Sequence, residues 1–337
     1  MVNIAPSTGA ATAVTSPAGT PLGPAPLRRP RSVRRTSSLQ ATWPEGRGGL
    51  LLLSGHARDI LTVDNRSPPE TLAEDRLSVR IRTDGVIQSF WTRRPSPGLA
   101  SLVGRPSIAG LRSALAEGLM DEAAAGTPLY TLLEDIPGVC VVSSWAWTRW
   151  PETRSQQLEA HAHARQSMQG VCIGFALGSS ALSAVSLGIH RSTRVPSPVH
   201  PEDPRGWHKL PVEDDVDMQR VRRIDVWLED GLLRVDSMFQ DSAAAPGGRE
   251  AAHEYGLLAT LDPKRRLLIE ARADPRILPH AECPAAAANL QRIFGTPLNE
   301  LRSRVLETLR RTAGCTHLND AVRALAEVPQ IAAPLLV

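Results

Sequence analysis

Sulfur and imidazole side chains near the end of the chain are the residues best suited to chemistry. Cys283, Cys315 and His317 lie there, and only one residue separates Cys315 from His317. Thiolate and imidazole are ligands that zinc prefers, so these three residues are candidate metal ligands, with zinc as the candidate cofactor. The Cys-x-His spacing is tighter than that of common zinc pairs, which counts against a structural zinc finger.

The same residues could instead support nucleophilic chemistry. Cys315 immediately precedes a predicted helix, whose positive end can lower the pKa of a thiol. His317 or His253 is then the candidate base, and Glu254 or Asp274 is the candidate carboxylate that orients the imidazole. A third alternative is purely structural, because buried cysteines pack as small apolar side chains. All three alternatives stay open at this stage.

Two further groups are candidates for ligand binding. The adjacent cations Arg222 and Arg223 could hold an anion, or could form ion pairs with a carboxylate such as Asp241 within the same part of the chain. Trp145 and Trp147 belong to a cluster of tryptophans in a chain with only 4% aromatic residues. They predict either the lining of a pocket for a small apolar ligand, acyl or aromatic, or ordinary packing.

Composition excludes several classes of protein. The chain has 38 Lys and Arg against 35 Asp and Glu, and a net charge of +3 is too balanced to predict nucleic-acid binding. The longest aliphatic run, Leu50 to Leu53, is far too short to span a membrane. The four cysteines lie far apart and include no CxxC, which favours reduced thiols in a cytoplasmic protein. Standard nucleotide-binding and hydrolase motifs are absent, and Leu257 stands where a zincin would need histidine.

An internal repeat predicts how the chain positions these residues. Similar short segments recur in the same order, about 180 to 192 residues apart. They are Arg34-Arg35 with Arg222-Arg223, Gly49-Leu50-Leu51 with Gly231-Leu232-Leu233, Leu111-Arg112-Ser113 with Leu301-Arg302-Ser303, and Ile136-Pro137 with Val328-Pro329. The order predicts a duplicated unit with a pseudo-twofold arrangement.

Each copy is expected to be an α+β unit, an antiparallel sheet of about four strands followed by helices. In the second copy, two alternating stretches flank Asp230-Gly231, the strongest short-range signal for a hairpin. Helical periodicity begins after Pro279. Between the copies, the apolar stretch Val139 to Trp147 is expected to be a buried strand.

Four regions are therefore expected along the chain. Residues 1–33 consist mainly of Ala, Pro, Thr, Ser and Gly, and this composition predicts a disordered tail. Residues 34–145 form the first and degenerate copy, residues 146–221 a helical and Pro-rich linker, and residues 222–337 the second copy.

The second copy resembles DUF2889, a bacterial family of unknown function, and the chain looks like a long two-copy form of it. The most specific segment is Gly314-Cys315-Thr316-His317-Leu318, and the resemblance covers roughly residues 220 to 330. Other pieces are Arg222-Arg223-Ile224, Asp230-Gly231, Asp241, His253-Glu254, Ala273-Asp274-Pro275 and Cys283-Pro284. The first copy departs from this pattern, since Pro128 stands near the position of His317. A site is therefore expected in the second copy.

The resemblance implies no reaction, so two functions remain. One is a small-molecule catabolic enzyme or ligand-binding protein with a pocket between the copies. The other is a non-enzymatic binding or regulatory module, or a protein with a structural metal.

Overall fold

A computed structural model describes residues 19–64, 67–183, 192–212 and 215–336 as a mixed α+β structure around one large antiparallel sheet. Its nine strands are β1 (Ser32–Thr42), β2 (Leu51–Thr62), β3 (Glu70–Ile81), β4 (Ile87–Thr92), β5 (Thr193–Val195), β6 (Asp217–Glu229), β7 (Leu232–Ala245), β8 (Gly248–Asp262) and β9 (Leu267–Ile277). The strand order is β4-β3-β2-β1-β6-β7-β8, and both β9 and β5 pair with the remaining edge of β8.

Two four-stranded meanders meet at the centre of this sheet. Strands β1 to β4 follow one another on one side, strands β6 to β9 do so on the other, and β1 pairs with β6. The predicted hairpin between β6 and β7 is confirmed, because Asp230 and Gly231 form its turn with φ of 52° and 75°. Two successive positive φ angles match the twist of antiparallel strands, and glycine adopts such an angle without strain.

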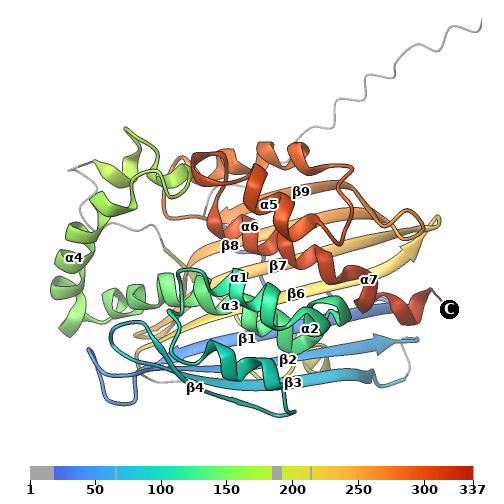
Figure 1. The fold of residues 1–337 in the computed structure, drawn as a ribbon, viewed down its shortest axis with the longest axis horizontal. Helices are drawn as coiled ribbons and strands as arrows, with labels where there is room; N and C mark the ends of the chain where they lie inside the picture. The colour runs from blue at the N-terminus through green and yellow to red at the C-terminus, as the bar shows by residue number, and fades with distance from the viewer. Residues whose placement is uncertain (1–18, 65–66, 184–191, 213–214, 337) are drawn as a thin grey trace, which may run out of the picture.

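Helices cover one face of the sheet (Figure 1). The α-helices on this face are α1 (Leu111–Gly118), α2 (Met120–Ala125), α3 (Pro128–Val142), α5 (Leu301–Thr308), α6 (Thr316–Arg323) and α7 (Val328–Ile331). The 3-10 helices η8 (Cys283–Ile293) and η10 (Ala324–Glu327) complete the layer. One hydrophobic cluster lies mainly between β6 to β9 and the C-terminal helices, and another mainly between β1 to β4 and α1 to α3.

Helix α3 replaces the strand that was expected from Val139. The helix continues to Val142, and the 3-10 helix η2 (Ser143–Arg149) follows it. Leu132, Ile136 and Val139 recur at helical spacing and are fully buried in the cluster over the first meander. This packing outweighs the strand preference of the valines. Helix α4 (Pro151–Arg165) then extends beside the sheet (Figure 1).

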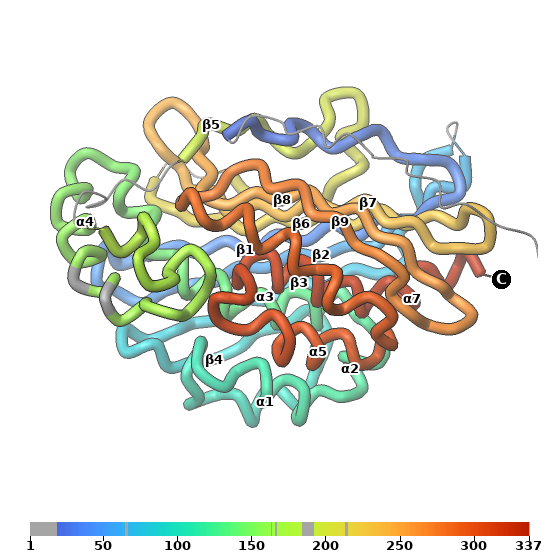
Figure 2. Tube along the Cα trace, turned by 90° about the horizontal axis from the view of Figure 1, so that it is seen from above, coloured from blue at the N-terminus to red at the C-terminus, as the bar shows by residue number. Residues whose placement is uncertain are grey.

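Extended chain covers the other face of the sheet (Figure 2). Residues 19–31 and 192–212 bring Ala25 and Trp207 against Val221 and Met238. The prediction of a disordered tail is therefore wrong for residues 19–33, and residues 1–18 lie outside the described residues. Composition failed there because a few apolar contacts and hydrogen bonds are enough to fix an extended segment on the sheet.

Polar contacts also hold this extended segment. The Leu22 amide donates a hydrogen bond to Glu254, and the Arg28 guanidinium makes two hydrogen bonds to Asp203, at 2.8 and 2.9 Å.

None of the helices in the described ranges is long and apolar enough to cross a membrane.

Candidate metal centre

Three potential metal ligands converge from two strands and a helix. Asp241 lies on β7, His253 on β8 and His317 in the first turn of α6. Asp241 Oδ2 is 3.6 Å from His253 Nδ1 and 3.6 Å from His317 Nε2. Across the described ranges, this is the one group of His, Cys, Asp and Glu whose ligand atoms all lie within 4.8 Å of one another.

A β-bulge brings the two strand residues together. Asp241 pairs with His253, while the next residue, Ser242, pairs with Ala251, so Ala252 is the extra residue. Without that extra residue, Asp241 would stand opposite Ala252, and His253 would point away from it. The bulge therefore creates the carboxylate–imidazole pair.

Helix α6 places the imidazole of His317 against that of His253. The ring of His317 stacks on that of His253, with centroids 3.5 Å apart and an interplanar angle of 16°. Burial and the nearby Arg220 guanidinium lower the pKa of His317 to about 3. The imidazole is consequently neutral at physiological pH, as a metal ligand must be.

The carboxylate of Asp241 is held by an arginine and still has lone pairs to offer. Arg220 donates from Nε to Oδ1 at 2.8 Å and from an NH₂ group to Oδ2 at 3.0 Å. Each carboxylate oxygen has two lone pairs, so Oδ2 can accept this bond and also face the imidazoles.

The spacing fits a tetrahedral ion. Zinc bonds of about 2.0–2.2 Å to nitrogen and oxygen, at tetrahedral angles, place ligand atoms about 3.4 Å apart. The observed 3.6 Å separations are close to that value. In nearly parallel rings the lone pairs run side by side, so binding of one ion requires one imidazole to turn out of the stack until both lone pairs point at the ion.

The lowered pKa of His317 predicts a loss of stability in acid. Between about pH 6.5 and 3 the unfolded chain binds a proton at this imidazole and the native protein does not, so stability falls as the pH falls. In metal-free protein, lowering the pH from 7 to 5 should cost about 2 kcal/mol through this group. His317→Gln should remove that part of the pH dependence in denaturant titrations, whereas His200→Gln should retain it. An unchanged slope in His317→Gln would contradict the assignment.

The cysteines lie beside this cluster rather than within it. Cys315 occupies the N-cap position of α6, is 2% exposed, and its Sγ is 3.9 Å from His317 Nδ1. Burial raises the pKa of the Cys315 thiol. Burial and the neighbouring Cys315 raise the pKa values of Cys172, to about 11, and of Cys283. These thiols are neutral at physiological pH, and burial also raises the pKa of the adjacent Tyr255 hydroxyl.

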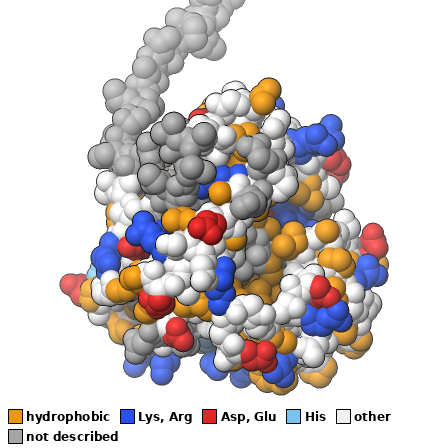
Figure 3. Space-filling model, turned by 90° about the vertical axis from the view of Figure 1, so that its left-hand side faces the viewer, with side chains coloured by type: hydrophobic (Ala, Val, Ile, Leu, Met, Phe, Trp, Pro, Cys, Tyr) orange, Lys and Arg blue, Asp and Glu red, His pale blue; other side chains and the backbone are white. Residues whose placement is uncertain are grey.

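Residues that follow α4 cover the thiol side of the site. The Ile173 amide donates to the Gly314 carbonyl at 2.9 Å, and a Cβ on Gly174 would approach Cys283 Sγ to 2.8 Å. Figure 3 shows the α4 side of the molecule, where hydrophobic side chains line a hollow. The side chains of His253 and His317 retain 11% and 12% exposure, so the centre is not sealed.

The other carboxylates suggested by sequence lie apart from the centre. Glu254 follows His253 on β8 and therefore faces the opposite side of the sheet. There it accepts hydrogen bonds from the Leu22 amide and the Gln240 side chain. Asp274 is 47% exposed and pairs with Arg276.

The two candidate anion-binding arginines are already paired. Arg222 donates to Asp135 at 2.8 Å, and Arg223 pairs with Asp225 and Asp236. The expected partnership of Arg222 or Arg223 with Asp241 is not made, because Arg220 occupies that carboxylate.

The two tryptophans pack outside the ligand group. Trp145 belongs to the cluster over the first meander, and Arg149 lies over its ring at 4.9 Å. Trp147 makes an edge contact with Trp43, at 5.2 Å between ring centroids.

Buried ion pairs connect the two halves of the structure. They hold Arg220 in place, a residue that the sequence analysis does not single out. Asp135, on α3, lies 3.2 Å from the Arg220 guanidinium. In the opposite direction, Glu327, at the end of η10, lies 2.6 Å from Arg35. Each of these arginines also pairs with an aspartate of its neighbouring strand, Arg220 with Asp241 and Arg35 with Asp59.

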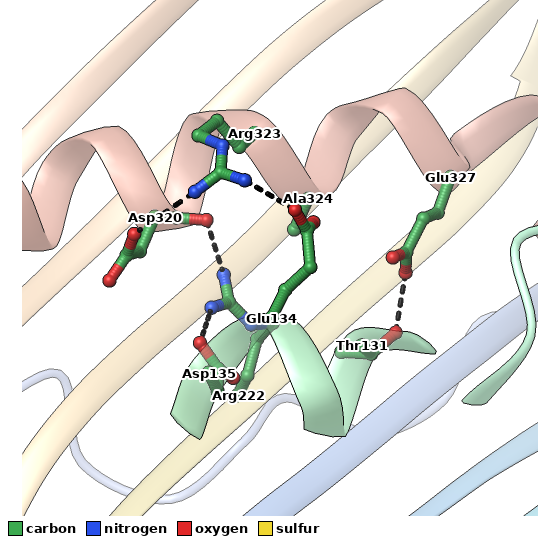
Figure 4. Close-up of a pocket in the computed structure, with 8 residues that line it drawn as sticks. All are labelled: Thr131, Glu134, Asp135, Arg222, Asp320, Arg323, Ala324 and Glu327. Atoms are coloured by element: carbon green, nitrogen blue, oxygen red, sulfur yellow. Dashed lines mark hydrogen bonds and ion pairs between the residues drawn. The ribbon is translucent and has the colours of Figure 1, made fainter. Parts of the chain in front are cut away.

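Helix α3 faces α6 and η10 across more of these pairs (Figure 4). Arg323 of α6 pairs with Glu134 of α3, and the Thr131 hydroxyl of α3 donates a hydrogen bond to Glu327 of η10. The charged side chains between the helices leave a cavity of about 10 Å³, room for about one water molecule. A small-molecule pocket is therefore not formed at this point.

Comparisons with known proteins place the candidate ligands in a recognised region. No curated protein and no solved structure shows a significant match. Residues 218–330, which contain Asp241, His253 and His317, match the model of DUF2889, described as a protein family of unknown function.

Proposed function

We propose that the protein binds a divalent transition-metal ion, with zinc the best match, through Asp241, His253 and His317. The observation that carries this proposal is the convergence of one carboxylate oxygen on two imidazole nitrogens, each at 3.6 Å. The lowered pKa of His317 supports it, since the ring needs no deprotonation before it binds metal.

Three protein ligands are typical of a zinc site that keeps one position open. Structural zinc sites are usually closed by four protein ligands, whereas catalytic ones hold a water molecule or substrate in the fourth position. This favours a metal-dependent enzyme or ligand-binding protein over a purely structural metal. The small acyl or aromatic ligand remains a prediction from the tryptophan cluster alone.

Zinc binding to the metal-free full chain tests the proposal. Isothermal titration calorimetry should give one ion per chain, and His253→Ala or His317→Ala should weaken binding at least about 100-fold, because each removes one of three ligands. His200→Ala is the matched control, since that imidazole lies outside the cluster and accepts a hydrogen bond from the Glu202 amide. Equal affinity in all three variants would refute the assigned ligands.

A thiol site is the second candidate, and one observation favours it. Cys315, His317 and Asp241 form a series, with 3.9 Å from Sγ to Nδ1 and 3.6 Å from Nε2 to Oδ2. In this alternative, Nε2 carries the proton and Nδ1 faces the thiol, whereas metal binding requires the proton on Nδ1. Rapid alkylation of Cys315 by iodoacetamide, slowed in His317→Ala, would favour the thiol site. The raised pKa and burial of Cys315 predict slow alkylation instead.

We also propose that the two meanders and their helices are the two copies of a duplicated unit, with the site retained in the second. The reciprocal ion pairs support this, because Asp135 and Glu327 precede the similar dipeptides Ile136-Pro137 and Val328-Pro329. Each of these acids reaches an arginine in the other half of the sheet.

A further inference from the structure

Resting on the metal centre proposed above, we propose that the bound ion takes a small carboxylate as its exogenous ligand. An ion brings two positive charges to the site, and the protein groups around it determine whether those charges are neutralised.

The charged groups around the centre already balance one another. Arg220 pairs with Asp241 at 2.8 Å and also contacts Asp135 and Asp320, at 3.2 and 3.1 Å. Each of the latter two aspartates has an arginine of its own. Arg222 lies 2.8 Å from Asp135, and Arg112 lies 2.7 Å from Asp320. A fourth arginine, Arg323, lies 3.6 Å from Asp320 and also pairs with Glu134. The four arginines are thus matched by three aspartates and one glutamate before any ion binds.

The imidazoles cannot alter this balance. An imidazole that coordinates an ion through a nitrogen lone pair is neutral, so neither ring adds charge to the loaded site. Asp241 is 0% exposed and Arg220 is 1% exposed, so water screens these charges poorly. A divalent ion in this position therefore leaves an excess of positive charge, and an anion in the open position removes part of it.

The site favours a small, flat anion. The two histidines expose only 11% and 12% of their side chains, so little of the centre is open to an exogenous ligand. Every nitrogen of the Arg220 guanidinium already donates to a carboxylate, so Arg220 cannot also form the bidentate hydrogen bonds that bind a phosphate. The anion must therefore be held by the ion, as a single carboxylate oxygen can be.

Metal–anion linkage tests this inference with acetate as the probe. The affinity of the full chain for Co²⁺ is measured from its visible absorption bands at constant ionic strength, with chloride replaced stepwise by acetate or by inorganic phosphate. Because coupling between two ligands is reciprocal, acetate at 100 mM should tighten Co²⁺ binding by about tenfold and shift its absorption bands. Phosphate should change the affinity by less than acetate does.

Asp135→Asn separates an electrostatic effect from a structural one. This change removes one negative charge from the balanced group and keeps the shape of the side chain. It should weaken Co²⁺ binding several-fold while strengthening acetate binding to the loaded protein, whereas simple damage to the site would weaken both. Asp84→Asn is the matched control, since Asp84 is 47% exposed and pairs with Arg82 in a turn.

The outcomes distinguish a failure of the carboxylate ligand from a failure of the metal centre. Normal Co²⁺ binding that acetate leaves unchanged would overturn the carboxylate ligand and leave the metal centre intact. A larger effect of phosphate than of acetate would also overturn it. Absence of Co²⁺ and Zn²⁺ binding would overturn both.

Discussion

Replacing Arg220 with methionine is expected to lower the free energy of unfolding by about 3–5 kcal/mol, because it leaves buried carboxylates without their cation. Arg220 contacts Asp241, Asp135 and Asp320, and none of the three is more than 8% exposed. Methionine restores most of the volume but none of the charge, so the loss reports on the ion pairs. Urea denaturation of the metal-free protein measures it.

Two matched variants accompany this measurement. Arg35→Met should have a similar cost, since Arg35 is 2% exposed and pairs with Asp59 and Glu327 in the other half of the sheet. Arg82→Met should change stability by less than about 0.5 kcal/mol, because this arginine pairs with an exposed aspartate at the surface. A cost below about 1 kcal/mol for Arg220→Met would show that the buried network does not hold the halves together.

Replacing Gly138 with alanine should destabilise the protein by about 3 kcal/mol, although alanine is favoured over glycine by about 1 kcal/mol within a helix. Gly138 lies inside α3, and a Cβ there would come within 2.2 Å of an Arg220 nitrogen and 2.7 Å of Asp320 Oδ2. Neither the Arg220 guanidinium nor the Asp320 carboxylate can move aside easily, because both are buried and ion-paired. The change should therefore push α3 away from Arg220.

Gly118→Ala is the control for the helix preference. Gly118 is the last residue of α1, and its added Cβ would meet only the Ser101 hydroxyl, at 3.4 Å. Thermal unfolding should show little change or a slight gain for this variant and a clear loss for Gly138→Ala. A gain in both would mean that α3 can move without cost, contrary to the close packing seen against Arg220.

Local signals predicted much of the sheet. The Asp230-Gly231 turn and the alternation on either side of it correspond to β6 and β7, and the helix expected from Thr316 corresponds to α6 and η10. These features depend on residues close in sequence, where turn chemistry and periodicity suffice. The strand expected from Val139 failed because tertiary packing of α3 overrode the preference of its valines.

The metal ligands could be predicted only in part. The sequence offers His253 and His317 as candidates, but it groups His317 with the cysteines and offers Asp241 only for ligand binding or an ion pair. Counting back from the turn between β7 and β8 places Asp241 opposite Ala252, and only the bulge moves His253 into that position. No pattern in the neighbouring sequence predicts this extra residue.

Arg220 was missed for a different reason. The repeat drew attention to Arg222 and Arg223, whereas the partner of Asp241 is determined by the register between β6 and β7, in which Arg220 stands opposite Asp241. The pairing across the halves depends on how α3 docks on the sheet, which involves residues far apart in sequence.

Zinc K-edge X-ray absorption of the zinc-loaded protein identifies the atoms that hold the ion. We expect a shell of nitrogen and oxygen only, at about 2.0–2.2 Å, with the outer-shell scattering of two imidazoles and no sulfur. His317→Ala should lose one imidazole from that pattern. A sulfur shell at about 2.3 Å would show instead that cysteine holds the ion, and would contradict the assignment of Asp241, His253 and His317 as the metal centre.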